Sequence, residues 1–125
     1  HIFGGDGASV AIDPRNANVL YVSYQNINLH RSLDGGRTFT RATSGINDNA
    51  LFIVPYVLDP NAPDRLWLGG TAVWRSDNQG RNWTRAGQSF GGGFGHRISA
   101  IAVAPGNSNL VLAGNSLGIY RQTAA

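Results

Sequence analysis

The chain has 125 residues, the length of one ordinary domain, and carries a formal net charge of +3. All ten cationic side chains are arginine, and they are spread from Arg15 to Arg121 without a basic run, so the sequence predicts no nucleic-acid interface. Cysteine is absent, which excludes disulfides, thiolate metal sites and cysteine nucleophiles, and no apolar stretch approaches the roughly 18 residues of a membrane span.

The remaining composition favours strands joined by tight turns. Lysine, glutamate and methionine, which all favour helices, are absent, whereas glycine occurs 17 times. Glycine adopts the positive φ values of tight turns without steric cost. We therefore predict an all-β fold.

The first third of the chain predicts four strands in succession. An apolar strand over 9–12 ends at Asp13 and Pro14, because proline lacks the N–H that a strand ladder needs. A polar turn follows, and further strands are predicted over 19–24, 29–32 and 39–43.

The same order of features occurs twice more along the chain. The Asp-Pro or Ala-Pro pairs that end the first strand of each copy are spaced by 59 − 13 = 46 and 104 − 59 = 45 residues. A period of about 45 residues fits a four-stranded unit of a repeat protein. The second copy predicts strands over 54–58, 65–68, 73–76 and 83–86, and the third, which stops before its fourth strand, over 98–103, 109–113 and 119–122.

An eight-residue motif follows the third strand in the first two copies. Residues 32–39 read Ser-Leu-Asp-Gly-Gly-Arg-Thr-Phe, and residues 76–83 read Ser-Asp-Asn-Gln-Gly-Arg-Asn-Trp, 76 − 32 = 44 residues further on. The acid or amide accepts backbone N–H bonds across a tight turn, the glycine supplies a positive φ, and the aromatic residue begins the next strand. The motif residues are Ser32, Asp34, Gly36, Phe39, Ser76, Asn78, Gly80 and Trp83.

This pair of motifs resembles the Asp-box, or BNR repeat, of β-propellers such as bacterial sialidases, xyloglucan-active glycosidases and sortilin-type propellers. The resemblance implies an all-β, partial β-propeller with just under three four-stranded blades and Asp-box turns. Blade one is expected at about 1–44, blade two at about 45–91 and a truncated blade three at about 92–125, where Gln122 and Ala124 replace the serine and aspartate of the box. In that family the box is a structural hairpin away from the active site, so it identifies the architecture better than the activity.

The resemblance also implies where a functional site would lie. Propellers of this kind carry their functional face on the loops that enter each innermost strand and on the loops that join strands two and three. The entering loops of this chain supply Asp6, Asp48, Asn49, His96 and Arg97. The loops between strands two and three supply Gln25, Asn26, Gly70, Thr71, Asn115 and Ser116. Among these we predict ligand binding by His96, Arg97, Gln25, Asn26 and Asp48.

Asp6 is the predicted catalytic residue. A carboxylate in a glycine-rich loop at the mouth of the channel is suited to acid–base catalysis or to binding a sugar hydroxyl. The alternative is that Asp6 accepts N–H bonds from Gly7 and Ala8 and only fixes the loop. Arg97 with His96 is suited to holding a carboxylate or phosphate, and the alternatives are an ion pair with Asp6 or a solvated position at the rim.

Three arginines, Arg31, Arg75 and Arg121, share one repeated position and invite comparison with the arginine triad that binds a carboxylate in sialidases. Because they directly precede the box turn, we expect them on outer strands, stacked on aromatic rings or paired with a box aspartate. Glutamate is absent, so a complete sialidase site cannot be assembled from this chain. His30 aligns with aromatic residues of the other copies and is expected to pack, and we predict no metal site and no cofactor.

The predicted function is that of a segment of a secreted or periplasmic bacterial protein that acts on or binds carbohydrate. The alternative is a non-catalytic propeller scaffold for protein–protein interaction or assembly. Whether the chain is an enzyme stays open. A glycoside hydrolase needs two carboxyls about 5–10 Å apart, and the loops offer only Asp6 and Asp48, so the chain alone would be insufficient.

Propellers close with about four to eight blades, and this chain predicts fewer than three. The first and last blades would each leave an apolar face open. The missing blades are expected from a longer chain, which the absence of methionine favours, and the alternative is a ring of identical copies. The apolar residues assigned to the open faces are Ile12, Leu20 and Tyr21 in the first blade and Ile101, Val103 and Leu112 in the last.

Overall fold

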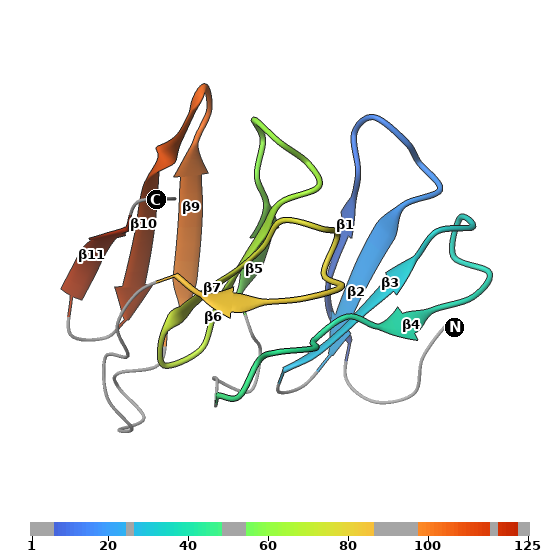
Figure 1. The fold of residues 1–125 in the computed structure, drawn as a ribbon, viewed down its shortest axis with the longest axis horizontal. Helices are drawn as coiled ribbons and strands as arrows, with labels where there is room; N and C mark the ends of the chain where they lie inside the picture. Colours follow the sequence, from blue (N-terminus) through green and yellow to red (C-terminus); the bar gives the residue numbers. More distant parts are fainter. Residues whose placement is uncertain (1–6, 25–26, 49–54, 87–97, 116–117, 123–125) are drawn as a thin grey trace.

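The computed structural model describes residues 7–24, 27–48, 55–86, 98–115 and 118–122. Within these ranges the chain forms three antiparallel β-sheets that follow one another in chain order and contains no helix (Figure 1). The prediction of an all-β fold is confirmed. Accordingly, this part of the chain has no helix that is long and apolar enough to cross a membrane.

The first two sheets have four strands each, arranged in the order of the sequence. The first sheet contains β1 (Gly7–Ile12), β2 (Leu20–Tyr24), β3 (Asn28–Ser32) and β4 (Thr40–Arg41). The second sheet contains β5 (Tyr56–Leu58), β6 (Leu66–Gly69), β7 (Val73–Ser76) and β8 (Thr84–Arg85). The third sheet has three described strands in the order β11-β10-β9, namely β9 (Ala100–Ala104), β10 (Asn107–Asn115) and β11 (Gly118–Gln122).

A buried aspartate follows the first strand in two of the sheets. Asp13 accepts a hydrogen bond from the backbone N–H of Arg15 at 2.8 Å, and Asp59 accepts the equivalent bond from Asn61 at 2.8 Å. The side chain of each aspartate thus caps a turn in the backbone two residues on. The sequence predicted the end of the strand from the proline, and the aspartate adds a second, hydrogen-bonded cause.

The first hydrophobic core lies between the first and second sheets. Tyr21 and Leu29 of the first sheet are fully buried against Leu66 and Leu68 of the second. A polar contact crosses the same interface, because the Tyr56 hydroxyl donates to the backbone carbonyl of Tyr21 at 3.3 Å. Sheet-on-sheet packing therefore joins the first two sheets into one body.

The second core lies between the second and third sheets, and β6 contributes to both cores. Leu66 and Leu68 point to the first sheet and Trp67 points to the third, because successive side chains of a strand face opposite sides. Trp67 is fully buried with Ile98 and Val111. Both faces of the second sheet are therefore covered, which explains why all four residues of β6 are buried.

The outer faces of the first and third sheets have no sheet in front of them within the described part of the chain. Val10 and Ile12 of the first sheet are 64% and 55% exposed. Leu112 and Ile119 of the third sheet are 43% and 78% exposed. Large apolar side chains therefore stand in solvent at both ends of the row of sheets.

The predicted composition of these open faces is wrong for three residues. Tyr21 is buried in the core between the first two sheets, and Ile101 and Val103 pack against the core between the second and third. The prediction grouped residues by strand, whereas the alternation of side chains assigns neighbouring residues to opposite faces.

The two repeat turns, residues 32–39 and 76–83, connect the third strand of each of the first two sheets to its fourth. In the first repeat turn the Ser32 hydroxyl donates to Asp34 Oδ1 at 2.8 Å and accepts from the N–H of Gly36 at 2.9 Å. Gly36 has a φ of +92°, the left-handed conformation that the motif predicts.

The second repeat turn has the same bonds with an amide in place of the acid. The Ser76 hydroxyl donates to Asn78 Oδ1 at 3.0 Å and accepts from the N–H of Gly80 at 2.9 Å, and the φ of Gly80 is +78°. Its aromatic residue, Trp83, is buried and donates its indole N–H to the carbonyl of Ala42 at 2.7 Å. This turn therefore docks on the end of the first sheet.

Candidate functional site

The end of β2 and the start of β3, the loop between β6 and β7, and the end of β10 and the start of β11 lie at one end of the three sheets, towards the lower edge of Figure 1. The hairpins that follow β1, β5 and β9 lie at the opposite end. We call the first of these ends the candidate face, because the family resemblance implies a functional site on these loops.

Five of the six predicted catalytic and ligand-binding residues lie outside the described residues, and their roles stay predictions. These are Asp6, Gln25, Asn26, His96 and Arg97. The sixth, Asp48, belongs to the described chain between β4 and β5.

Asp48 is held by the loop between β6 and β7. Its Oδ2 atom accepts hydrogen bonds from the backbone N–H of Thr71 at 2.9 Å, from that of Ala72 at 3.1 Å and from the indole N–H of Trp74 at 2.8 Å. Its Oδ1 atom accepts a bond from the Thr71 hydroxyl. A carboxylate offers about four acceptor positions, so these four donors give Asp48 a structural task as the anchor of this loop.

The same loop connects the third sheet to this arrangement. The N–H of Gly70 bonds the carbonyl of Ala72 at 2.9 Å, and the carbonyl of Gly70 accepts the N–H of Ile98 at 2.8 Å. Asp48 follows the last strand of the first sheet in the chain, the loop belongs to the second sheet, and Ile98 directly precedes the third sheet. One loop therefore joins three consecutive sheets at the candidate face through hydrogen bonds.

Sequence reasoning identified part of this cluster. It placed Asp48, Gly70 and Thr71 at the candidate face from their positions in the repeat. It did not predict the hydrogen bond from Trp74 to Asp48, because the position of Trp74, which aligns with His30, was expected only to pack in the core. The signal for Trp74 is its indole N–H, which needs an acceptor when the ring is buried.

Charged side chains gather at the opposite end and pair with one another. Arg15 lies 2.8 Å from Asp13 and 2.6 Å from Asp64, so its guanidinium joins the first hairpins of two sheets. The hydrogen bond from Arg15 holds the pKa of Asp13 below its usual value, although burial opposes this shift. Arg65 lies 2.7 Å from Asp77. These pairs are engaged in holding hairpins and turns together.

The three repeated arginines do not form one site. Arg31 donates to the carbonyl of Gln79 at 2.6 Å, across the interface of the first two sheets. The guanidinium of Arg75 lies 5.9 Å from the ring centroid of Trp67 in its own sheet. Arg121 lies on β11 of the third sheet and is exposed. Arg75 therefore lies against an aromatic ring, as predicted, whereas Arg31 bonds a backbone carbonyl of the second sheet, a contact that the sequence did not predict.

No group of three or more histidine and aspartate side chains is placed to hold a metal ion within the described residues. His30 is partly buried on β3, and burial lowers its pKa, with a smaller effect from the charge of Arg41.

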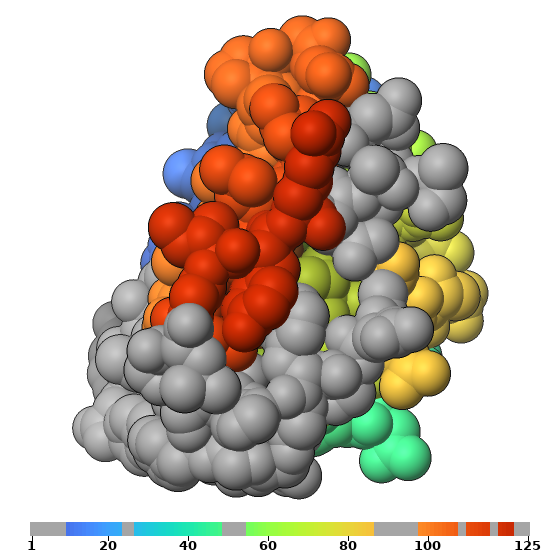
Figure 2. All heavy atoms as spheres, turned by 90° about the vertical axis from the view of Figure 1, so that its left-hand side faces the viewer, coloured from blue at the N-terminus to red at the C-terminus, as the bar shows by residue number. Residues whose placement is uncertain are grey.

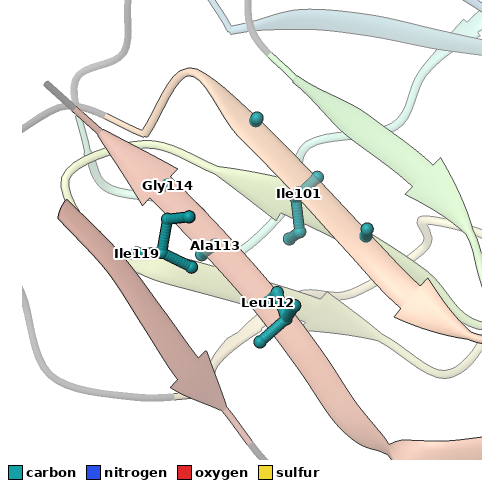
Figure 3. A pocket seen from close by; sticks show the side chains of 7 residues that line it. Ile101, Leu112, Ala113, Gly114 and Ile119 are labelled. Carbon is teal, nitrogen blue, oxygen red and sulfur yellow. The ribbon is translucent and has the colours of Figure 1, made fainter.

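A shallow hollow of about 190 Å³ lies on the outer face of the third sheet. Figure 2 shows this sheet on the face turned to the viewer, and Figure 3 shows Leu112 and Ile119 standing out from it. The hollow provides no polar side chain for chemistry, so it is a surface for packing. Its lining residues are Ala100, Ile101, Ala102, Leu112, Ala113, Gly114 and Ile119.

No family model and no curated protein matches the sequence, but solved structures match the fold. An ancestral GH74 enzyme is 25% identical with a TM-score of 0.66, and the match covers 90% of this chain and 14% of that enzyme. The GH74 xyloglucanase from Xanthomonas campestris is 22% identical with a TM-score of 0.64, covering 93% of this chain and 22% of the enzyme. The structure of YCF48 bound to D1 peptide is 14% identical with a TM-score of 0.61, covering 95% of this chain and 36% of that protein.

These matched proteins are β-propellers, and the chain spans between about one seventh and about one third of their length. The match extends over nearly all of this chain, so the three sheets correspond to consecutive propeller blades. The chain is therefore a partial β-propeller.

Proposed function

We propose that the chain is an Asp-box propeller segment of a secreted or periplasmic bacterial protein that binds or cleaves carbohydrate. The observation that carries this proposal is the likeness of the fold to GH74 glycosidases over 90% of the chain, at 25% identity for one of them. At this level of identity the likeness concerns the architecture, so the substrate class is our inference.

The Asp-box assignment is supported by the geometry of the two repeat turns. In each turn a serine hydroxyl bonds both the acid or amide and the N–H of a glycine with positive φ. The turns lie at the end opposite the candidate face. We assign the motif residues a structural role and divide the blades at about 1–44, 45–91 and 92–125.

The carbohydrate site is assigned to the candidate face, with Asp6 as the catalytic candidate and Gln25, Asn26, His96 and Arg97 as binding residues. Asp48 supports this face through the loop between β6 and β7. Glycoside hydrolysis needs two carboxyl groups in reach of one bond. Because the oxygens of Asp48 are already bonded, the second carboxyl is assigned to a blade outside this chain.

A glycan array tests this assignment directly. The chain and its Asp6→Ala variant are compared on xyloglucan, other plant polysaccharides and sialylated glycans. We expect binding to at least one polysaccharide and a loss of about tenfold or more in the variant, the scale of one lost charged hydrogen bond. Asp77→Ala serves as the control, since Asp77 is an exposed carboxylate on the opposite end.

Binding that both variants retain equally would contradict the role of Asp6. The absence of binding to every glycan would contradict the carbohydrate assignment itself. Circular dichroism of each variant shows whether a loss of binding reflects a loss of fold.

A non-catalytic scaffold is the second candidate function, because the fold also matches YCF48 in a structure that contains a bound peptide. An extended peptide can be held by main-chain bonds and side-chain pockets without any catalytic group. Peptide-array binding at the candidate face, together with a negative glycan array, would favour this candidate.

A further inference from the structure

The interface between the first and second sheets contains two buried hydrogen-bond donors that have no acceptor among the described residues. They are the hydroxyl of Tyr21, a fully buried residue, and the Nε atom of Arg31. The two residues are register partners on β2 and β3, so their side chains are neighbours on one face of the first sheet. This face is turned to the second sheet, because Tyr21 belongs to the core between the sheets and Arg31 donates to the carbonyl of Gln79. Buried polar groups of native proteins are almost always hydrogen-bonded, so these two donors indicate a bound acceptor.

The second sheet has the same pair of positions, and there both side chains have an acidic partner. Trp67 and Arg75 are the equivalent register partners on β6 and β7. The indole N–H of Trp67 donates to Asp59 Oδ2 at 3.3 Å. The Nε atom of Arg75 lies 3.4 Å from Asp77 Oδ2. A carboxylate therefore stands beside each of these two groups in the second sheet.

The first of these carboxylates has no counterpart in the first sheet. Leu33 occupies the position that Asp77 has in the second repeat turn, since 77 − 44 = 33. Leucine offers no acceptor, so Arg31 has no carboxylate partner among the described residues. Its one bond in this part of the chain is the bond to the carbonyl of Gln79 at 2.6 Å.

The second carboxylate is present in the first sheet, but another side chain uses it. Asp13 is the equivalent of Asp59 and ends the same strand. Arg15 donates to both oxygens of Asp13, from Nε at 3.1 Å to Oδ1 and from Nη2 at 2.8 Å to Oδ2. In the second sheet Asn61 stands in the place of Arg15 and bonds Oδ1 alone through its backbone N–H. The Tyr21 hydroxyl thus lacks the acceptor that its counterpart has.

The charged groups around these two donors carry an excess of positive charge. The charged side chains that act on the Tyr21 hydroxyl are Arg31, Arg81, Asp13 and Asp64. Both aspartates already pair with Arg15. Arg81 bonds only a backbone carbonyl and an amide oxygen, and Arg31 only a carbonyl. Three arginines therefore face two aspartates. Burial, together with the charge of Arg81, lowers the pKa of Arg31, as expected for a guanidinium without a carboxylate partner.

We propose that a small anion, of the size and charge of chloride, binds between the first and second sheets and accepts hydrogen bonds from the Tyr21 hydroxyl and from Arg31 Nε. An anion satisfies both donors and also neutralises the excess positive charge, whereas a water molecule satisfies the donors alone. Both donors are buried only when the two sheets are stacked, so the anion binds the folded chain and stabilises it. The proposal rests on the packing of these two sheets and is independent of the carbohydrate assignment.

Bromide is the probe for the position of the site, because its anomalous X-ray scattering distinguishes it from water. Crystals of the full chain are soaked in sodium bromide. We expect an anomalous peak within hydrogen-bond distance of Tyr21 Oη and Arg31 Nε. A water molecule at this place without an anomalous signal would overturn the proposal. An acceptor from the protein itself on both donors would overturn it as well.

A chloride titration tests the site in solution. Thermal unfolding is followed at constant ionic strength, with sodium chloride replacing sodium gluconate, whose anion is too bulky for a buried site. A tenfold increase in chloride above the dissociation constant should raise the melting temperature by about 5 °C. Tyr21→Phe removes one donor and is expected to lose most of this increase. Tyr56→Phe is the matched control, because its hydroxyl lies in the same interface and bonds the carbonyl of Tyr21. Equal chloride dependence of the two variants would overturn the role of Tyr21.

Leu33→Asp replaces the anion with a carboxylate of the chain itself. Leu33 is 49% exposed, so the core between the sheets does not depend on its side chain. We expect the variant to melt at a higher temperature than the unmodified chain at low chloride, to lose the chloride dependence and to show no bromide peak. Leu33→Asn has nearly the same shape without the charge and should keep both the chloride dependence and the peak. Bromide binding that Leu33→Asp retains in full would contradict an anion site at Arg31.

Discussion

At the scale of single residues, Asp48 shows how a candidate ligand residue acquires a structural task. Its position at the entrance to the second blade suggested an accessible carboxylate. The fold instead brings three donors of the loop between β6 and β7, and the indole N–H of Trp74 on β7, onto its two oxygens. A buried or partly buried donor that loses its acceptor costs about 1–3 kcal/mol, so this single side chain fixes the shape of the loop that supports the candidate face.

Asp48→Ala is therefore expected to lower the free energy of unfolding by about 2–3 kcal/mol, because the Trp74 indole and two backbone N–H groups lose their acceptor. Asp48→Asn keeps one carbonyl oxygen and should lose less. Urea unfolding measures both changes. Asp77→Ala, which removes an exposed partner of Arg65, is the matched control and should stay within about 1 kcal/mol of the unmodified chain.

An unchanged stability of Asp48→Ala would contradict the anchoring role. A loss of glycan binding in Asp48→Asn at unchanged stability would support a direct contact with ligand.

At the scale of elements, the two repeat turns carry out the same task with different chemistry. Asp34 accepts from the hydroxyl and N–H of Thr38 and from the hydroxyl of Ser32. These hydrogen bonds lower the pKa of Asp34 to about 2, and the bond from the Thr38 hydroxyl has the largest effect. Asn78 makes the corresponding backbone bond to Asn82 at 2.9 Å without an ionisable group. The hydrogen bonds that Asp34 accepts therefore depend on pH, whereas the bond that Asn78 accepts from Asn82 does not.

The depressed pKa fixes the sign of this dependence. Asp34 stabilises the fold above its ordinary pKa of 3.8, and the contribution is lost as the pH falls towards 2. Asp34→Asn is therefore expected to be less stable than the unmodified chain at pH 7, with most of the difference gone at pH 2. Urea unfolding at several pH values measures this, and Asn78→Asp should introduce a similar dependence in the second turn. Parallel stability curves for all three chains would contradict this interpretation.

At the scale of the whole molecule, the packing of one sheet on the next is set by small residues at the contact. Gly69 of β6 lies so close to Ile98 of the third sheet that an added Cβ would overlap its side chain. Gly114 occupies the equivalent register position in β10, opposite Ile119 as Gly69 is opposite Val73. A Cβ at Gly114 would meet no atom closer than 3.8 Å. At this register position the covered second sheet requires a glycine, whereas the third sheet, whose outer face is uncovered within the described residues, has room for an added Cβ.

Gly69→Ala is expected to destabilise the fold by about 3 kcal/mol, the upper end of the cost of overpacking a core. Gly114→Ala is expected to change the stability of the chain by no more than about 0.5 kcal/mol. Thermal unfolding compares the two variants. Equal destabilisation by both variants would contradict the register equivalence of the sheets.

Most of the architecture was predictable because short sequence patterns specify it. The proline and aspartate after the first strand, the glycines of positive φ and the repeat of about 45 residues each act within a few neighbouring residues. They predicted the number of sheets, their strand order and the three strands described in the third sheet. The predicted strand bounds differ most in β10, which was predicted over 109–113 and extends over Asn107–Asn115. The fourth strands are shorter than predicted, since only Thr40–Arg41 and Thr84–Arg85 pair.

The sequence by itself determined the strands, the turns and the kind of repeat, since these depend on backbone geometry and on the spacing of a few residue types. Only the tertiary structure decided which face each side chain occupies, so that Tyr21 is in a core and Leu112 in solvent. It also decided that Asp48 bonds Thr71 and Trp74. These contacts join residues more than 20 positions apart, and no local rule specifies them until one sheet has stacked on the next.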